Sequence, residues 1–261
     1  MIDLHCHVLA GIDDGPQTVE GSLTLARAAH AAGLRTLVAT PHVSARYRND
    51  AATIARLVAE LNERLRAENI ALNVLPGAEI AITYVPELDP AALLGLGLGG
   101  GPWLLVEPPF TAVAPGLENL IYTLCGRGHR VLLAHPERCP ALQRDRSIVP
   151  ALAGQGVLMS VTAGSLIGRF GSEVKRYALE LASAELIHNV TSDAHNTDRR
   201  PPGIADAIEQ AGLGPLTAWL TDAVPRAILA GAEIPPRPSD VALPIADGHS
   251  AHRRRPWKLR R

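Results

Sequence analysis

Short apolar runs alternate along the chain with longer amphipathic stretches, and this alternation limits the fold more than any other feature. Seven runs have the length and composition of strands: residues 2–4, 36–39, 74–78, 103–106, 131–134, 158–161 and 187–191. Helical patterns lie between most of them, at residues 19–32, 51–68, 117–127, 147–153 and 173–184. Near-continuous apolar strands that each lead to a helix are typical of parallel sheets buried on both faces. We therefore expect a single α/β domain, either a closed or nearly closed (β/α) barrel or, as the alternative, an open doubly wound sheet.

The chain changes character toward its carboxyl end. After Gly203 we expect two or three short helices, with Pro215 and Pro225 at helix starts. The expected division is a domain over residues 1–235 and a proline-rich, basic tail over residues 236–261. Six of the 25 Lys and Arg residues lie in the last nine positions, so the formal charge of −1 becomes −7 over residues 1–252. The tail is either a solvated end or a docking segment for an anionic membrane surface or an acidic partner.

The composition also narrows the class of partner and the compartment. An acidic body disfavours a nucleic-acid groove and suits a protein that holds divalent cations. The first residues lack the basic and long apolar segments of a signal peptide, and no apolar run reaches the roughly 18 residues of a membrane span. Three cysteines do not suggest a disulfide framework. These features predict a cytoplasmic protein.

Residues that can bind metals follow six of the seven predicted strands. Because the carboxyl ends of parallel strands meet at one edge, we expect these side chains to meet at one mouth. The candidates are His5, His7, Asp14, His42, Glu79, Glu107, His135, Asp193 and His195. His5 and His7, two residues apart on a strand, should point to the same side, and Cys6 to the other. Such a set suits zinc, manganese or iron.

A single histidine at a strand end is more often a packing residue than a ligand, but that explanation would have to hold separately at every one of these positions. The remaining histidines are expected to have no special role: His30, His129, His188, His249 and His252. Other catalytic signatures are absent. Cys125 and Cys139 are each followed by an arginine after four residues, not the five that a cysteine phosphatase requires, and there is no Gly-x-Ser-x-Gly, P-loop or dinucleotide fingerprint. The glycine-rich residues 95–101 are expected to form a loop.

A set of motifs in fixed order resembles a known family. IDLHCHVLAGIDDGP at 2–16 is followed by TPH at 40–42, GAE at 77–79, AHPER at 134–138, TAGSLIGRFG at 162–171 and SDAHN at 192–196. The set resembles the polymerase-and-histidinol-phosphatase (PHP) superfamily, and within it the bacterial protein-tyrosine phosphatases of capsule and exopolysaccharide gene clusters. The resemblance covers residues 1 to about 232. It implies a distorted (β/α)7 TIM-like barrel with three divalent metal ions, manganese first, with iron, zinc or cobalt as alternatives.

The resemblance also distributes the ligands. It implies that His5, His7, Glu79 and Asp193 hold the first ion, that Glu79, Glu107 and His135 hold the second, and that Asp14, His42 and His195 hold the third. It implies that Arg138 and Arg200 bind the phosphate, with Arg199 as an alternative to Arg200. One departure is Pro108, where the group more often has an aromatic residue after the glutamate, so the pocket wall is expected to differ.

The implied activity is hydrolysis of phosphotyrosine on a protein, such as a bacterial tyrosine kinase that controls capsule or exopolysaccharide synthesis, by an enzyme that can be oligomeric. A metal-bridging water, its pKa lowered toward neutrality, would attack phosphorus while the arginines hold the non-bridging oxygens. Three alternatives remain open. They are a small-molecule phosphatase acting on histidinol phosphate or a sugar phosphate, a catalytically silent metal-binding scaffold, and an amidohydrolase, which usually needs a bridging lysine, whereas Lys175 is the only lysine before the tail.

Overall fold

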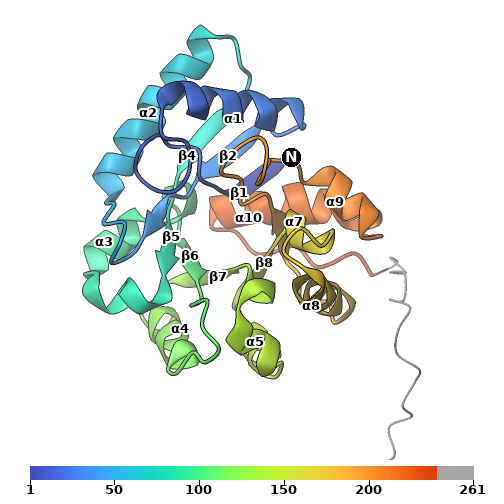
Figure 1. Ribbon diagram of the computed structural model, residues 1–261. Helices are drawn as coiled ribbons and strands as arrows, with labels where there is room; N and C mark the ends of the chain where they lie inside the picture. Colours follow the sequence, from blue (N-terminus) through green and yellow to red (C-terminus); the bar gives the residue numbers. More distant parts are fainter. Residues whose placement is uncertain (240–261) are drawn as a thin grey trace, which may run out of the picture.

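Residues 1–239, which the computed structural model describes, alternate between strands and helices (Figure 1). The strands are β1 (Ile2–Cys6), β2 (Thr36–Ala39), β3 (His42–Val43), β4 (Asn73–Pro76), β5 (Glu79–Ala81), β6 (Trp103–Glu107), β7 (Arg130–Ala134), β8 (Leu158–Thr162) and β9 (Asn189–Thr191). The α-helices are α1 (Val19–Ala31), α2 (Ala51–Ala67), α3 (Pro90–Gly95), α4 (Leu117–Gly126), α5 (Pro140–Arg144), α6 (Ile148–Ala153), α7 (Ala163–Leu166), α8 (Ser172–Ser183), α9 (Ala205–Gln210) and α10 (Val224–Ala230). The predicted α/β class with parallel sheets is confirmed.

Every pairing between these strands is parallel, in two sheets of order β1-β2-β4 and β3-β5-β6-β7-β8-β9. The sheets share chain segments, because β3 follows β2 after two residues and β5 follows β4 after two. At the other end of the larger sheet, Cys6 forms a parallel bridge with Ala194. There the amide of His7 donates to the carbonyl of Ala194 at 2.9 Å, and the amide of Asp193 donates to that of His5 at 2.9 Å.

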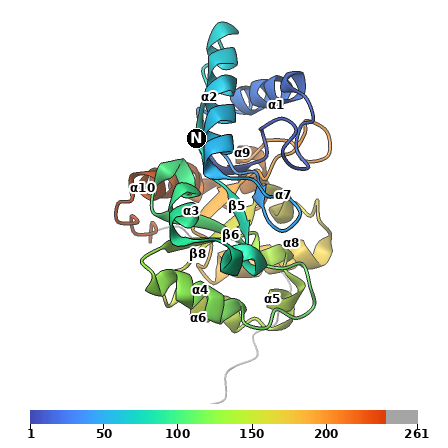
Figure 2. The ribbon, with the colours of Figure 1, turned by 90° about the vertical axis from the view of Figure 1, so that its left-hand side faces the viewer.

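Helices cover the strands on several sides, and most strand residues are buried. Figures 1 and 2 show α1 and α2 at one end of the molecule and α4 and α5 at the opposite end. All residues of β1, β8 and β9 are buried, as the near-continuous apolar runs predict. The buried Asp3 accepts hydrogen bonds at Oδ1 from the amides of His5 and Ser192 (3.2 Å each), and at Oδ2 from the Ser192 hydroxyl (2.5 Å). This carboxylate therefore joins β1 to the segment after β9.

Most predicted elements are present with ends shifted by a few residues, but one strand is divided. The expected strand over 74–78 is β4 and β5, interrupted at Gly77 and Ala78. A side chain at Gly77 would place its Cβ 2.7 Å from Cγ1 of Val38, so this close approach requires glycine. Past the interruption the amide of Glu79 donates to the carbonyl of Pro41 (3.1 Å). After the break, the chain thus passes from the first sheet, which contains β4, into the second, which contains β5.

The predicted loop at 95–101 is wrong in part, since Leu98–Gly100 forms a 3-10 turn. Helices α3, α5 and α7, which have four to six residues each, were not predicted. Short helical segments follow Gly203 as expected: α9, the 3-10 turn Gly214–Leu216, the π-helical turn Trp219–Ala223 and α10. Pro215 and Pro225 lie in the first turns of their helices, as predicted.

Within residues 1–239, no helix combines the length and apolar character that a membrane crossing requires. Most of the predicted basic tail, including its six terminal Lys and Arg residues, His249 and His252, lies outside the described residues.

One partly buried histidine outside the cluster of candidate ligands predicts how stability depends on pH. His188 precedes β9; its Nδ1 accepts a hydrogen bond from the Met159 amide at 3.1 Å, and burial lowers the pKa of its imidazole to about 4. An unfolded histidine titrates near 6.5, so this lowered pKa stabilises the fold above pH 6.5. The stabilisation is lost as the pH falls toward 4.

We expect His188→Asn, whose Oδ1 can accept the same hydrogen bond, to flatten that dependence. Between pH 7 and pH 4.5 the wild type should lose about 1–2 kcal/mol more unfolding free energy than the variant. Urea unfolding of both proteins in chelator at the two pH values measures this difference. Equal losses would show that His188 does not titrate within the fold.

Candidate metal centre

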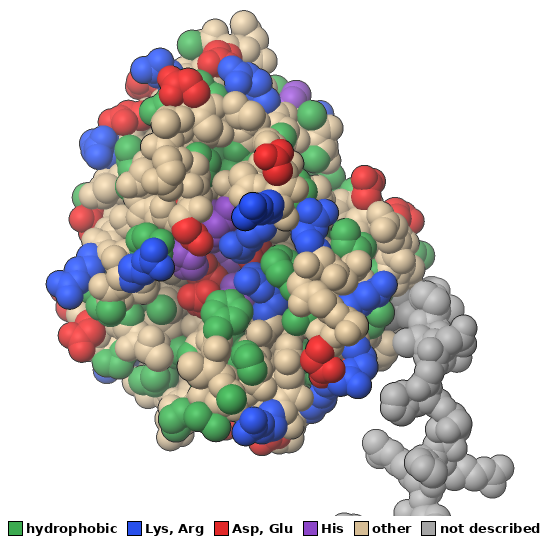
Figure 3. Space-filling model, in the orientation of Figure 1, with side chains coloured by type: hydrophobic (Ala, Val, Ile, Leu, Met, Phe, Trp, Pro, Cys, Tyr) green, Lys and Arg blue, Asp and Glu red, His purple; other side chains and the backbone are tan. Residues whose placement is uncertain are grey.

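The nine predicted ligands lie together at the carboxyl ends of the strands. β1 provides His5 and leads directly to His7, β3 provides His42, and the loop after β1 provides Asp14. Glu79 lies in β5 and Glu107 in β6. His135 follows β7, and Asp193 and His195 follow β9. Figure 3 shows histidine and acidic side chains in a hollow of the surface with arginine or lysine side chains around it. The convergence predicted from parallel strands is therefore present in the structure.

Four overlapping sets of these residues bring nitrogen or carboxylate oxygen atoms within 4.8 Å of one another. The sets are His7, Asp14, His42 and His195; His5, His7 and Asp193; His5, Glu79 and His135; and His42, Glu79 and Glu107. They include all nine candidates, and each set joins residues from at least two strand ends. Glu79 belongs to two sets, which is the position expected of a carboxylate shared between ions.

The innermost atoms fit a divalent cation. Oε2 of Glu79 and Oδ1 of Asp193 are buried and have no hydrogen-bond partner. The Glu79 oxygen lies 3.3 Å from Nε2 of His5 and of His7, and the Asp193 oxygen lies 3.4 and 3.5 Å from the same nitrogens. Metal bonds of about 2.0–2.2 Å hold neighbouring ligand atoms roughly 3 Å apart or more, so this spacing suits one shared ion. Buried carboxylate oxygens without a donor also need such compensation.

The geometric sets overlap only in part with the ligand distribution that the resemblance implies. His5, His7 and Asp193 stay together, as do Asp14, His42 and His195, to which the structure adds His7. Oε1 of Glu79 lies 2.8 Å from Nε2 of His135, whereas Oε1 of Glu107 lies 3.8 Å from that nitrogen. The assignment of each residue to a particular ion therefore stays a prediction.

Burial and neighbouring charges shift the pKa values in this cluster. Although burial opposes the charged form, the carboxylates of Asp13 and Glu79 raise the pKa of His7 to about 9, and those of Asp14 and Glu79 raise the pKa of His42 to about 11. Burial and the nearby Glu79 raise the pKa of Glu107 to about 8. Protons thus offset the carboxylate charge in the metal-free chain, and metal binding is expected to release them.

Two of the candidate ligands have backbone conformations that are unusual for residues other than glycine. The φ angle is 31° at His135 and 51° at Asp193, both in the left-handed region. Their amides are held by hydrogen bonds, to the carbonyl of Ser160 (2.8 Å) and to that of His5 (2.9 Å) respectively. Such conformations persist where the surrounding structure imposes them, and they concentrate at functional sites.

Asp13 contacts the candidate ligands, and the sequence did not predict this position. Its Oδ2 lies 2.7 Å from Nδ1 of His7 and also accepts from the amide of His42 (3.3 Å), while its Oδ1 accepts from the amide of Gly15 (2.9 Å). A carboxylate on the far nitrogen of a metal-binding imidazole fixes the orientation of the ring and increases its basicity. The pair Asp13-Asp14 beside His-x-His was the available signal, but only Asp14 was assigned a role.

Glu137 is a second missed residue. It is fully buried, and its Oε1 accepts hydrogen bonds from the amide of Thr162 (3.0 Å) and the hydroxyl of Ser165 (2.7 Å). It thereby fastens the 3-10 turn Pro136–Arg138 to β8 and α7. The AHPER motif drew attention to Arg138, whereas the packing role of its neighbour depends on segments distant in sequence.

Two arginines approach the cluster at the same carboxylate. Nη1 of Arg138 donates to Oδ2 of Asp193 (2.5 Å), and Nη2 of Arg200 donates to the same oxygen. Nη1 of Arg200 also lies 2.9 Å from Nε2 of His195. Arg199 is exposed, and its carbonyl accepts from Arg169 (3.3 Å). Of the two arginines that the sequence left open, Arg200 is thus the one that contacts the cluster.

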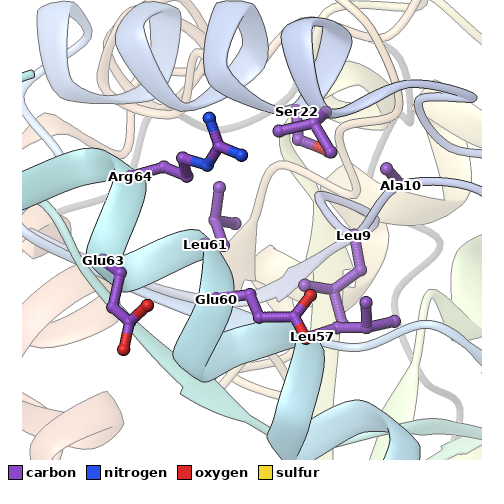
Figure 4. A pocket seen from close by; sticks show the side chains of 9 residues that line it. Leu9, Ala10, Ser22, Leu57, Glu60, Leu61, Glu63 and Arg64 are labelled. Carbon is purple, nitrogen blue, oxygen red and sulfur yellow. The ribbon is translucent and has the colours of Figure 1, made fainter. Parts of the chain in front are cut away.

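A separate hollow of about 240 Å³ lies between α1 and α2 (Figure 4). Its lining includes Leu9, Ser22, Leu61 and Arg64. None of the nine candidate ligands lines it. This hollow is therefore distinct from the candidate metal centre.

We expect Asp13→Asn to weaken metal binding, because an amide does not supply the charge that Oδ2 directs at the His7 ring. Loss of such a supporting carboxylate typically lowers metal affinity about 10- to 100-fold. Calorimetric titration of metal-stripped protein with Mn²⁺ measures the change. Glu20→Gln on the exposed start of α1 is the matched control and should bind as the wild type does. Unchanged affinity in Asp13→Asn would remove Asp13 from the site.

The chain is similar in sequence to a known family and to several known proteins. The profile of the family described as "Capsular polysaccharide synthesis, CpsB/CapC" matches residues 1–212. The chain is 41% identical over 201 residues to the tyrosine-protein phosphatase YwqE of Bacillus subtilis (strain 168), an alignment that covers 77% of this chain and 79% of YwqE. It is 29% identical over 224 residues to the tyrosine-protein phosphatase CpsB of Streptococcus pneumoniae, an alignment that covers 80% of this chain and 88% of CpsB.

Solved structures agree with the sequence matches. The chain superposes with a TM-score of 0.80 and 35% identity on a structure from a crystallographic study of YwqE and CpsB, which describes both as unique metal-dependent tyrosine phosphatases. That alignment covers 91% of this chain and 99% of the other. A β-aspartyl dipeptidase from Fervidobacterium islandicum AW-1 gives a TM-score of 0.53 at 12% identity. That alignment covers 87% of this chain and 72% of the dipeptidase. The latter likeness concerns the fold alone.

Proposed function

The chain belongs to the CpsB/CapC family of capsular polysaccharide synthesis, and we propose that it is a metal-dependent protein-tyrosine phosphatase. The observation that carries this proposal is the meeting of nine potential metal ligands with Arg138 and Arg200 at one carboxylate, Asp193. Metal ligands and phosphate-binding groups are the two parts that hydrolysis of a phosphate monoester requires.

We propose that the nine residues hold three divalent ions, with manganese first and iron, zinc or cobalt as alternatives, since imidazole and carboxylate ligands accept all four. When bound, the ions supply Lewis acidity and lower the pKa of a bound water. Asp13 orients the ring of His7, and the backbone hydrogen bonds at His135 and Asp193 hold those ligands in place.

Arg138 and Arg200 would bind the phosphoryl group. A phosphate monoester carries two negative charges that persist through the transition state, and guanidiniums match pairs of its oxygens. Both side chains are partly buried and fixed by Asp193, so little ordering is needed on substrate binding. A phenol has a pKa of about 10, so a tyrosine leaving group needs less acid assistance than an alkoxide.

Cys6 and Cys139 do not offer an alternative nucleophile. Cys6 and Cys139 are buried, and burial raises the pKa of both thiols, which opposes the thiolate form. Their Sγ atoms donate to the carbonyls of Ala194 (3.5 Å) and Pro109 (3.2 Å). We therefore expect no covalent phosphocysteine.

We also propose that residues 1–235 form one domain, a distorted (β/α)7 barrel with β2 and β3 as one interrupted strand and β4 and β5 as another. The supporting observations are the parallel pairings in chain order and the contacts between β1 and the segment after β9. We further propose a cytoplasmic location and a phosphorylated bacterial tyrosine kinase as substrate, in keeping with a family of capsule synthesis. The basic tail would be a further segment outside the barrel.

Two alternatives use the same metal centre differently. A small-molecule phosphatase acting on histidinol phosphate or a sugar phosphate would share the ligands and both arginines, and a silent scaffold would bind metal without turnover. An amidohydrolase is disfavoured, because Lys175, the single lysine before the tail, is exposed on α8. Initial rates on a phosphotyrosine peptide, a phosphoserine peptide and histidinol phosphate, with manganese-loaded protein, separate these functions.

We expect Arg138→Ala to lower kcat on the phosphotyrosine peptide about 100-fold or more, since it removes a fixed cation from the developing charge. Metal content, measured by elemental analysis, should stay at the wild-type level. Arg199→Ala, on an exposed neighbour of Arg200, is the control and should keep normal turnover. Near-normal rates in Arg138→Ala would contradict its proposed role.

A further inference from the structure

The chain contains two phenylalanines, and both lie against Arg138. Cζ of this arginine is 5.1 Å from the centre of the Phe110 ring and 4.4 Å from the centre of the Phe170 ring. Phe110 also stacks on His135, with ring centres 5.4 Å apart and planes inclined by 25°. In a chain with 3% aromatic residues, this concentration at a phosphate-binding arginine is unlike ordinary core packing.

Phe110 is the ring of the pair that stays open to solvent. Its relative exposure is 49%, although its neighbours are a candidate metal ligand and a proposed phosphate-binding group. It lies in the segment between β6 and α4, where Val113 is also exposed. Exposed apolar groups beside a polar hollow mark surfaces that bind an apolar part of a ligand.

The other aromatic side chains near the cluster are already engaged. Phe170 is partly buried in the turn before α8, where a Cβ at Gly164 would lie 3.0 Å from its Cε2, so glycine leaves room for that ring. Tyr47 stacks on His42 at 5.6 Å and carries the guanidinium of Arg46 at 5.0 Å from its ring centre. Phe110 therefore has the most ring surface left for a substrate.

The position of Phe110 suits a particular class of ester. In phosphotyrosine the aromatic ring is bonded directly to the ester oxygen, so a phosphoryl group held by Arg138 keeps the ring close to that arginine. Aromatic pairs attract each other at centre-to-centre distances of roughly 4.5–7 Å. In phosphoserine or a sugar phosphate the ester oxygen is bonded to a saturated carbon, which offers no such face.

We propose that Phe110 packs against the phenyl ring of the phosphotyrosyl group and thereby selects aryl over alkyl phosphate monoesters. This inference rests on the proposed phosphatase function and identifies one residue that sets its substrate class. Phe110 acts by contact with the substrate ring and takes no part in metal binding.

The test compares Phe110→Ala with the wild type, both as the full chain loaded with manganese, on a phosphotyrosine peptide and on β-glycerophosphate. We expect kcat/KM for the peptide to fall about 10-fold, and that for the alkyl ester to change less than about twofold. Phe110→Tyr should restore most of the loss. Val113→Ala, in the same exposed segment, is the matched control and should leave both values unchanged.

A binding measurement separates this inference from the proposed function. We expect Phe110→Ala to weaken calorimetric binding of phenylphosphonate about 10-fold and to leave that of methylphosphonate unchanged. Equal losses for both ligands would show that Phe110 only supports Arg138 and His135, and no loss for either would show that it does not touch the ligand. Either outcome overturns the inference. If the wild type hydrolyses neither ester, the proposed function fails, and the phosphonate pair still decides whether Phe110 recognises an aryl group.

Discussion

The carboxylates of Glu79 and Asp193 are buried at the edge where the parallel strands end, and positive charge must offset them. An unpaired buried carboxylate is strongly unfavourable, so the imidazoles and guanidiniums that surround these two groups are required by the fold as well as by the chemistry. The parallel pairings place imidazoles from residues far apart in sequence around each carboxylate. The cations around Glu79 and Asp193 therefore stabilise the fold and also form the candidate site.

The sequence predicted the strand-end convergence because it depends on two local signals, an apolar run and the residue that follows it. Contacts between segments far apart in sequence were not predictable in this way. The hydrogen bonds of Glu137 to Thr162 and Ser165, and the packing of Phe110 on His135, require knowledge of which strands are neighbours. The interruption at Gly77 was missed because a glycine inside an apolar run leaves the pattern intact.

The architecture of this molecule does not by itself indicate its substrate. The likeness to a β-aspartyl dipeptidase at 12% identity shows that similar architecture occurs in an enzyme named for a different substrate. What points to phosphate here is the pair of arginines on Asp193, from the segments after β7 and after β9. What points to an aromatic ester is Phe110, from the segment after β6. Under these proposals, specificity resides in the connecting segments, while the strand ends supply the candidate ligands.

The span of the cluster, from His5 in the first strand to His195 after the last, has a consequence for biosynthesis. During translation the early ligands leave the ribosome long before Asp193 and His195 are made. Non-local pairings of this kind form late, after much of the chain has been ordered. Under the proposed ligand assignment, full metal loading therefore has to wait until the domain is nearly complete.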